Sequence, residues 1–134
     1  MSYKIIKGWP GEHTLDYQFT LAANATVVPG DMFCVSTAGT AIAGTYASNG
    51  SDAADLHFFC FDVDTITGKV MGLPGNIIVE LESGDYTAGS YAPAQNVTCT
   101  ANKIDVISSS TKVVGKVLSL NATTGTMQVL IKGN

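Results

Sequence analysis

The sequence predicts an all-β fold: a single-domain β-barrel or β-sandwich with an extended N-terminal arm. Two observations predict this class. Apolar and polar residues alternate in short runs that end in glycine, proline, asparagine or aspartate, as in strands joined by tight turns. No stretch between these turns combines the length and the period of a typical helix. A chain of 134 residues is also long enough to bury one core of its own.

Residues 1–24 are predicted to form the arm. Trp9 opens a Trp-Pro-Gly turn, and residues 17–21 alternate like a strand. The apolar side chains of the first ten residues have no clear strand partner in the sequence, and apolar surface of this kind is costly to leave in water. We therefore expect the arm to join the sheet late or to contact another subunit, with Tyr3, Ile5, Ile6 and Trp9 as the candidate interface residues.

Residues 25–134 are predicted to form a β-rich body of about nine strands. Residues 56–63 hold three of the five phenylalanines, which indicates a central strand with an apolar layer on each face. At most one short helix fits, near residues 53–55. The other strands expected before residue 84 are Thr26–Val28, Met32–Ser36, Thr40–Ala43, Lys69–Leu73 and Asn76–Leu81, the last with Ile77, Val79 and Leu81 on one face.

Residues 84–131 have a distinctive order of parts. An Asp-Tyr-Thr-Ala-Gly-Ser-Tyr-Ala-Pro entry at residues 85–93 leads into a threonine-rich strand at residues 97–100. A turn at residues 101–103, a Val-Val-Gly-Lys-Val strand from residue 113 and a closing hairpin around residues 121–131 follow. In this order the segment resembles the small β-rich capsid decoration (cement) proteins of tailed bacteriophages.

This resemblance implies a non-enzymatic virion protein that binds the outer surface of a phage head. Such a protein bridges neighbouring copies of the major capsid protein and stabilises the shell against the pressure of packaged DNA. The resemblance further implies a homotrimer at three-fold positions of the capsid, made in the host cytoplasm. The N-terminal arm is then expected to touch the shell or a neighbouring copy.

Composition limits the other partners. The net charge is −4 and all seven basic residues are lysines, so the chain lacks the arginine that favours phosphate and guanine recognition. We expect no direct binding to nucleic acid. No run approaches the roughly 20 apolar residues of a membrane span, and the N-terminal apolar stretch is too short for a signal peptide. Only 13% of the residues are charged, which is typical of a protein that covers surface against partners or presents uncharged Ser and Thr.

The residues that could carry chemistry are sparse. Cys34, Cys60 and Cys99 form no CxxC pair and lie among strand-forming residues, so buried thiols are expected. His57 lies within the phenylalanine run and is interpreted as a core residue. Residues 62–68 partly match a calcium loop but lack its closing glutamate, and a hairpin turn is favoured. We expect no catalysis, no metal and no cofactor.

Two alternatives of different classes stay open. One is another phage structural β-domain, such as a head-fibre base or a tail component. The other is a carbohydrate-binding β-module, in which an exposed aromatic residue such as Trp9 stacks on a sugar ring. A neighbouring major capsid gene would favour decoration over both.

Overall fold

A computed structural model describes residues 3–7, 17–23, 25–36, 38–46, 56–107 and 112–133. The described parts contain eleven strands and no helix, which confirms the prediction of an all-β fold. The strands are β1 (Tyr3–Lys7), β2 (Gln18–Thr20), β3 (Met32–Val35), β4 (Ala41–Ala43), β5 (Leu56–Val63), β6 (Lys69–Leu73), β7 (Ile77–Leu81), β8 (Asn96–Thr100), β9 (Lys103–Val106), β10 (Gly115–Asn121) and β11 (Thr126–Ile131).

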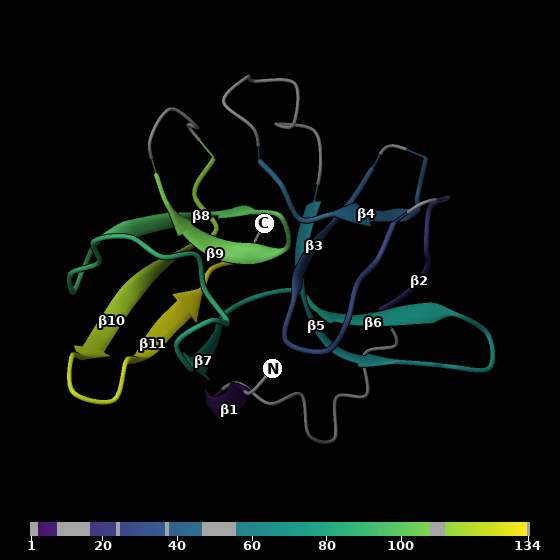
Figure 1. Cartoon of the computed structure of the whole chain (residues 1–134). Helices are drawn as coiled ribbons and strands as arrows, with labels where there is room; N and C mark the ends of the chain where they lie inside the picture. The colour runs from purple at the N-terminus through teal and green to yellow at the C-terminus, as the bar shows by residue number, and fades with distance from the viewer. Residues whose placement is uncertain are drawn as a thin grey trace.

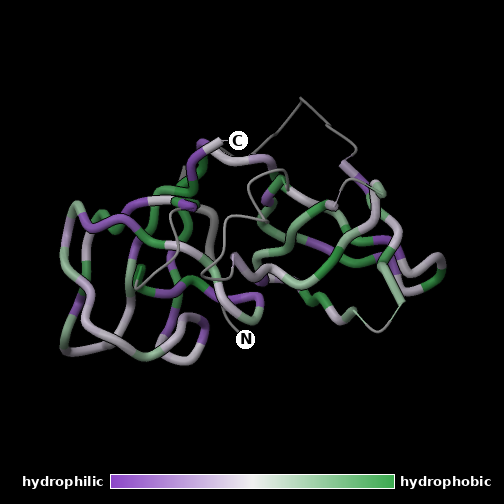
Figure 2. The backbone as a smooth tube through the Cα atoms, turned by 90° about the horizontal axis from the view of Figure 1, so that it is seen from above, coloured by the Kyte–Doolittle hydropathy of each residue, from purple (hydrophilic) through white to green (hydrophobic). Residues whose placement is uncertain are grey.

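The strands form two antiparallel sheets that lie side by side (Figure 1). The six-stranded sheet has the order β1-β7-β11-β10-β8-β9, and the five-stranded sheet has the order β2-β6-β5-β3-β4. Among the described strands, neither sheet is closed into a barrel by continuous strand pairing. Seen from above, the two sheets make two lobes (Figure 2).

The five-stranded sheet curls around a small core of its own. An isolated bridge between Leu21 and Ala41 connects the ends of its two edge strands, and the amide of Ala22 donates to the carbonyl of Ala41 at 2.9 Å. Phe58 and Cys60 of β5 point into this core, whose buried members are Val27, Phe33, Val35, Ala41, Phe58, Cys60 and Val70. Alternation along β5 places Phe58 and Cys60 on the same face of the sheet.

A larger core joins the two sheets. Phe59 of β5 belongs to it, so β5 has a buried apolar layer on each face, as its phenylalanine run predicted. The predicted face of β7 is also confirmed, because Ile77, Val79 and Leu81 are buried here. The five-stranded sheet contributes Met32, Cys34, Phe59 and Leu73, and the six-stranded sheet contributes residues from β7 to β11.

Asn102, in the turn between β8 and β9, connects the two sheets by hydrogen bonds. Its Oδ1 accepts from the amide of Gly44 at 2.7 Å, and its Nδ2 donates to the carbonyl of Thr26 at 2.7 Å and to Asp31 Oδ2 at 3.4 Å. Its main chain donates to the Gly44 carbonyl at 3.1 Å and accepts from the amide of Met32 at 2.8 Å. Asn102 takes this position with a φ of 68°, which asparagine tolerates better than most residues.

Two strand predictions were wrong for reasons that Asn102 explains in part. Residues 26–28 form no strand, because the Thr26 carbonyl accepts from Asn102 and the Val28 amide donates to Asp31 Oδ2 at 3.0 Å. Strand β9 was not predicted, because the sequence indicated only the turn at residues 101–103. In the structure β9 begins directly after Asn102 and pairs with β8. Residues 53–55, near which at most one short helix was expected to fit, lie outside the described residues.

Candidate functional site

The predicted interface residues Tyr3, Ile5 and Ile6 lie in β1, at one edge of the six-stranded sheet. The backbone of β1 pairs with β7: Tyr3 lies opposite Leu81 and Ile5 opposite Val79, with an irregularity between Ile5 and Lys7. Trp9 lies outside the described residues. Among the described strands, β1 has a neighbour on one side only, so its second edge has no strand partner in the part of the chain that the structure describes.

The segment expected to be an arm supplies an edge strand to each sheet. β1 borders the six-stranded sheet, and β2 pairs with β6 at the border of the five-stranded sheet. In β2, Phe19 packs against the small core, with its ring centroid 4.9 Å from that of Phe58. The described part of residues 1–24 is thus integrated into the fold through backbone pairing.

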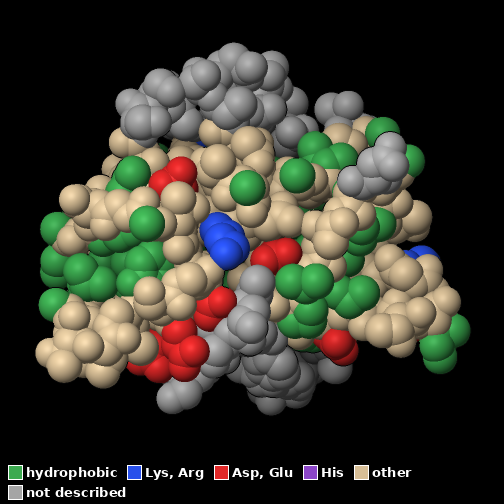
Figure 3. Space-filling view, in the orientation of Figure 1, with side chains coloured by type: hydrophobic (Ala, Val, Ile, Leu, Met, Phe, Trp, Pro, Cys, Tyr) green, Lys and Arg blue, Asp and Glu red, His purple; other side chains and the backbone are tan. Residues whose placement is uncertain are grey.

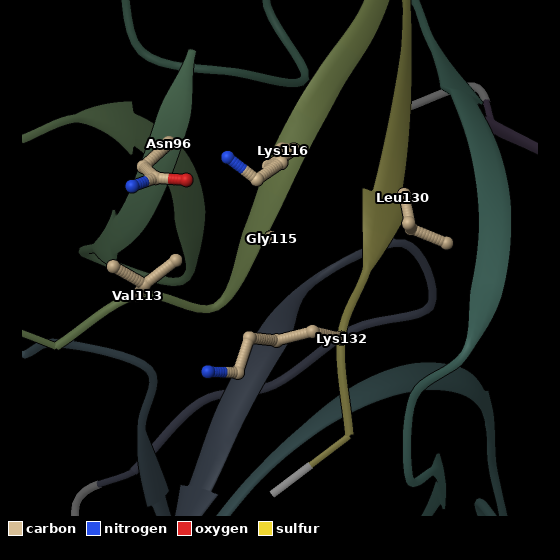
Figure 4. Close-up of a pocket in the computed structure, with 6 residues that line it drawn as sticks. All are labelled: Asn96, Val113, Gly115, Lys116, Leu130 and Lys132. Carbon is tan, nitrogen blue, oxygen red and sulfur yellow. The ribbon is translucent and has the colours of Figure 1, made fainter. Parts of the chain in front are cut away.

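A pocket of about 340 Å³ lies on the six-stranded sheet (Figure 4). Lys116 pairs with Asn96 of β8 on one side and with Leu130 of β11 on the other, so these residues share a row across the outer face. Lys116 and Lys132 extend to the same side, toward Asn96 and Val113 (Figure 4). The lining consists of Asn96, Val113, Gly115, Lys116, Leu130 and Lys132, which combines two ammonium groups with an apolar floor and contains no carboxylate.

The turn between β5 and β6 presents the most exposed of the large hydrophobic side chains described. Ile66 is 93% exposed at its tip. The Asp64 carboxylate accepts from the amides of Ile66 at 2.9 Å and Thr67 at 3.3 Å, and Gly68, with a φ of 75°, donates to the Asp64 carbonyl at 2.7 Å. The hairpin turn that the sequence favoured over a calcium loop is confirmed.

Further apolar and acidic groups lie on the face shown in Figure 3. Hydrophobic side chains gather at its left edge, where Figure 1 places β10, and Leu118 and Leu120 of that strand are 41% and 37% exposed. Acidic side chains gather below the centre of this face (Figure 3). Single exposed leucines are common on protein surfaces.

Tyr86 and Tyr91 are partly buried and pack against the larger core. The Tyr86 hydroxyl donates to the Gly125 carbonyl at 2.5 Å, and the Tyr91 hydroxyl donates to the Thr87 carbonyl at 2.5 Å. Their rings meet edge to face with centroids 5.3 Å apart. Both tyrosines therefore fix the loop that leads into β8.

The groups that could carry chemistry are buried. The thiols of Cys34, Cys60 and Cys99 are buried in the two cores, which confirms their prediction, and burial raises the pKa of Cys60 to about 12. The ring of His57 is fully buried, with Nε2 2.8 Å from the carbonyl of Lys132 and Nδ1 3.5 Å from the Tyr46 hydroxyl. Burial lowers the pKa of His57, so the neutral ring links the two sheets.

The described residues contain no group of three or more His, Cys, Asp or Glu side chains placed to hold a metal ion. In the same part of the chain, no helix has the length and apolar character needed to cross a membrane. No family model, curated protein or solved structure matches this chain.

The two pocket lysines and Ile66 were not predicted as functional residues. The signal for Ile66 was the Asp-Thr-Ile-Thr-Gly turn, in which the single aliphatic residue has to point outward. Lys116 and Lys132 could not be paired from the sequence, because their proximity depends on the register of β10 with β11. Asn102 gave no signal beyond its preference for a turn.

Proposed function

We propose that this protein is a sandwich-like decoration protein that binds the outer surface of a phage head and bridges copies of the major capsid protein. The observation that carries the proposal is the order of parts in residues 84–131. In the structure these parts are the tyrosine-pinned loop, β8, β9, β10 and β11, and the four strands are adjacent in one sheet in the order β11-β10-β8-β9. The proposal rests on the resemblance of this order to decoration proteins.

The edge position of β1 among the described strands supports a role for the N-terminal segment in capsid contact. Strand edges bind other chains by backbone hydrogen bonds, with side chains adding specificity. Lys4 and Lys7 in this strand discourage indiscriminate strand pairing, which favours a selected partner. Tyr3, Ile5, Ile6 and Trp9 therefore stay the proposed contact residues, with the major capsid protein as partner and a trimer at three-fold positions as the expected assembly.

The test is binding to undecorated heads assembled from the major capsid protein encoded beside this gene. Purified protein is mixed with such heads, and the bound fraction is measured after sedimentation of the particles. We expect saturable binding, and electron cryomicroscopy should place the protein at three-fold positions. The absence of a neighbouring capsid gene, or binding to tails and not to heads, would contradict the proposal.

Point variants test the contact residues without removing two edge strands. Trp9→Ala and Tyr3→Ala are expected to weaken head binding by about tenfold or more, since aromatic residues dominate many interfaces. Leu56→Ala is the matched control, because Leu56 is 46% exposed and belongs to the other sheet. Circular dichroism should show unchanged folding for all three variants. Equal binding by all of them would remove the N-terminal segment from the contact.

A further inference from the structure

The β5–β6 hairpin ends in an exposed apolar side chain, Ile66, and Asp62 and Asp64 precede it in the sequence. Ile66 projects from a turn that three hydrogen bonds to Asp64 hold in place. Asp62, near the end of β5, is exposed, and Lys69, at the start of β6, is the basic residue of the hairpin. The hydrogen bonds from the Ile66 and Thr67 amides and the Thr67 side chain lower the pKa of Asp64, so that this carboxylate is ionised at neutral pH.

The pocket on the six-stranded sheet has the complementary character. Val113 and Leu130 provide aliphatic surface, and the ammonium groups of Lys116 and Lys132 extend over the same side (Figure 4). An aliphatic side chain flanked by carboxylates would bury apolar surface against Val113 and Leu130 while its charges lie near the two lysines. The pocket volume of about 340 Å³ leaves room for one such side chain.

The two features lie in different sheets of the same chain. Figure 1 places the β5–β6 hairpin at the outer end of the five-stranded sheet, whereas β8, β10 and β11 lie in the other lobe. We propose that copies of this protein associate head to tail, with the β5–β6 hairpin of one copy docked in the pocket formed by β8, β10 and β11 of the next. Each copy carries one hairpin and one pocket, so the contact is heterologous.

A heterologous contact has a specific consequence for assembly. It generates a closed ring when the rotation between copies closes, and an open chain otherwise. The inference is independent of the proposed function, because it concerns contacts between copies of this chain in solution. Binding to phage heads can fail while self-association persists, and the reverse also holds.

The experiment measures self-association by sedimentation velocity at concentrations up to about 1 mM. The hairpin variant is Asp62→Asn with Ile66→Ser, and the pocket variant is Lys116→Gln with Lys132→Gln. We expect the wild type to associate and each variant alone to be weakened by about tenfold or more. An equimolar mixture of the two variants should form dimers that do not grow, because one intact pocket then meets one intact hairpin.

Matched controls separate this contact from general charge and hydrophobicity. Thr100→Glu with Thr123→Glu changes the net charge by the same amount and sign as the pocket variant, at exposed positions outside the pocket lining. Val28→Ser removes an aliphatic side chain that is 42% exposed in a loop. Both controls should associate like the wild type. Higher salt should weaken wild-type association, since the charges lie at the surface.

Three outcomes would overturn the proposal. A wild type that stays monomeric over the whole concentration range shows that the contact does not form. Controls that weaken association as much as the hairpin and pocket variants show that the effect is not local. A mixture of the two variants that stays monomeric, although the wild type associates, shows that hairpin and pocket do not bind each other. Unchanged circular dichroism spectra confirm that the variants fold.

Discussion

At the scale of single residues, Asn102 has the largest structural role that its sequence context does not reveal. A turn at this position was predicted, and asparagine is common in turns. What the sequence could not supply is the set of partners, which lie 58 to 76 residues away along the chain. Side-chain hydrogen bonds over such separations depend on the packing of the two sheets, so local propensity carries no information about them.

Replacement of Asn102 tests this role. Asn102→Gly keeps a residue that accepts positive φ but removes the bonds to Gly44, Thr26 and Asp31, two of which involve partly buried groups. We expect a loss of about 2–4 kcal/mol in the free energy of unfolding, measured in urea. Asn102→Ala should lose about 1 kcal/mol more, because alanine resists a φ of 68°. Asn76→Gly, at a φ of 58°, is the control and should change little.

His57 makes stability depend on pH. In the folded protein burial lowers the pKa of His57 below 6.5, against the hydrogen bond to the Lys132 carbonyl, and Lys112 and Lys132 lower it further. The unfolded chain protonates this histidine near its ordinary pKa. Below that pH the unfolded state therefore binds more protons, and stability falls by at most about 1.4 kcal/mol per pH unit until the folded state also protonates.

The measurement is the free energy of unfolding in urea from about pH 8 to about pH 5. The wild type should lose stability relative to His57→Gln as the pH falls through this range. His13→Gln, which changes the other histidine, should follow the wild type. If the free energy of unfolding depends on pH in the same way for the wild type and for His57→Gln, the pKa of His57 is not lowered in the folded protein.

At the scale of elements, the sequence predicted the strands whose pattern is local. β5, β6 and the inward face of β7 were recognised from their apolar runs and alternation. β1 and β9 were not recognised. Each is defined more by its pairing, β1 with β7 and β9 with β8, than by its own residues. Of the candidate contact residues, the structure places Tyr3, Ile5 and Ile6 in the edge strand β1. The role of this edge in binding stays a prediction.

Gly72 in β6 allows two phenylalanines to pack inside the curled sheet. A Cβ atom at this position would lie 2.7 Å from the Phe33 ring and 2.7 Å from Phe58 Cβ. Gly72→Ala should therefore lower the free energy of unfolding by about 1–3 kcal/mol, as overpacking does in other cores. Gly68→Ala is the contrast: it meets nothing within 4 Å, and strain at its φ of 75° should cost about 1 kcal/mol. Equal losses at both sites would argue against this packing.

At the scale of the whole molecule, the two sheets share one of their two cores. The larger core contains side chains from both sheets, and main-chain hydrogen bonds cross between them, such as Tyr46 to Cys99 at 3.0 Å and Met32 to Asn102 at 2.8 Å. His57 adds a third connection to the C-terminal end of β11 through Lys132. Neither sheet can lose its partner without exposing part of this core.

We therefore expect the protein to unfold as one cooperative unit although it has two lobes. Native-state hydrogen exchange should give the same free energy of opening for the most protected amides of β5 and of β7, equal to that of global unfolding. Asn102→Gly should lower the free energy of opening in β5 and in β7 by the same amount, because it changes the stability of the whole unit. The same equality between β5 and β7 is expected for Gly72→Ala. If Gly72→Ala lowers protection in β5 and leaves β7 unchanged, the five-stranded sheet opens independently. The shared core would then be too weak to couple the sheets.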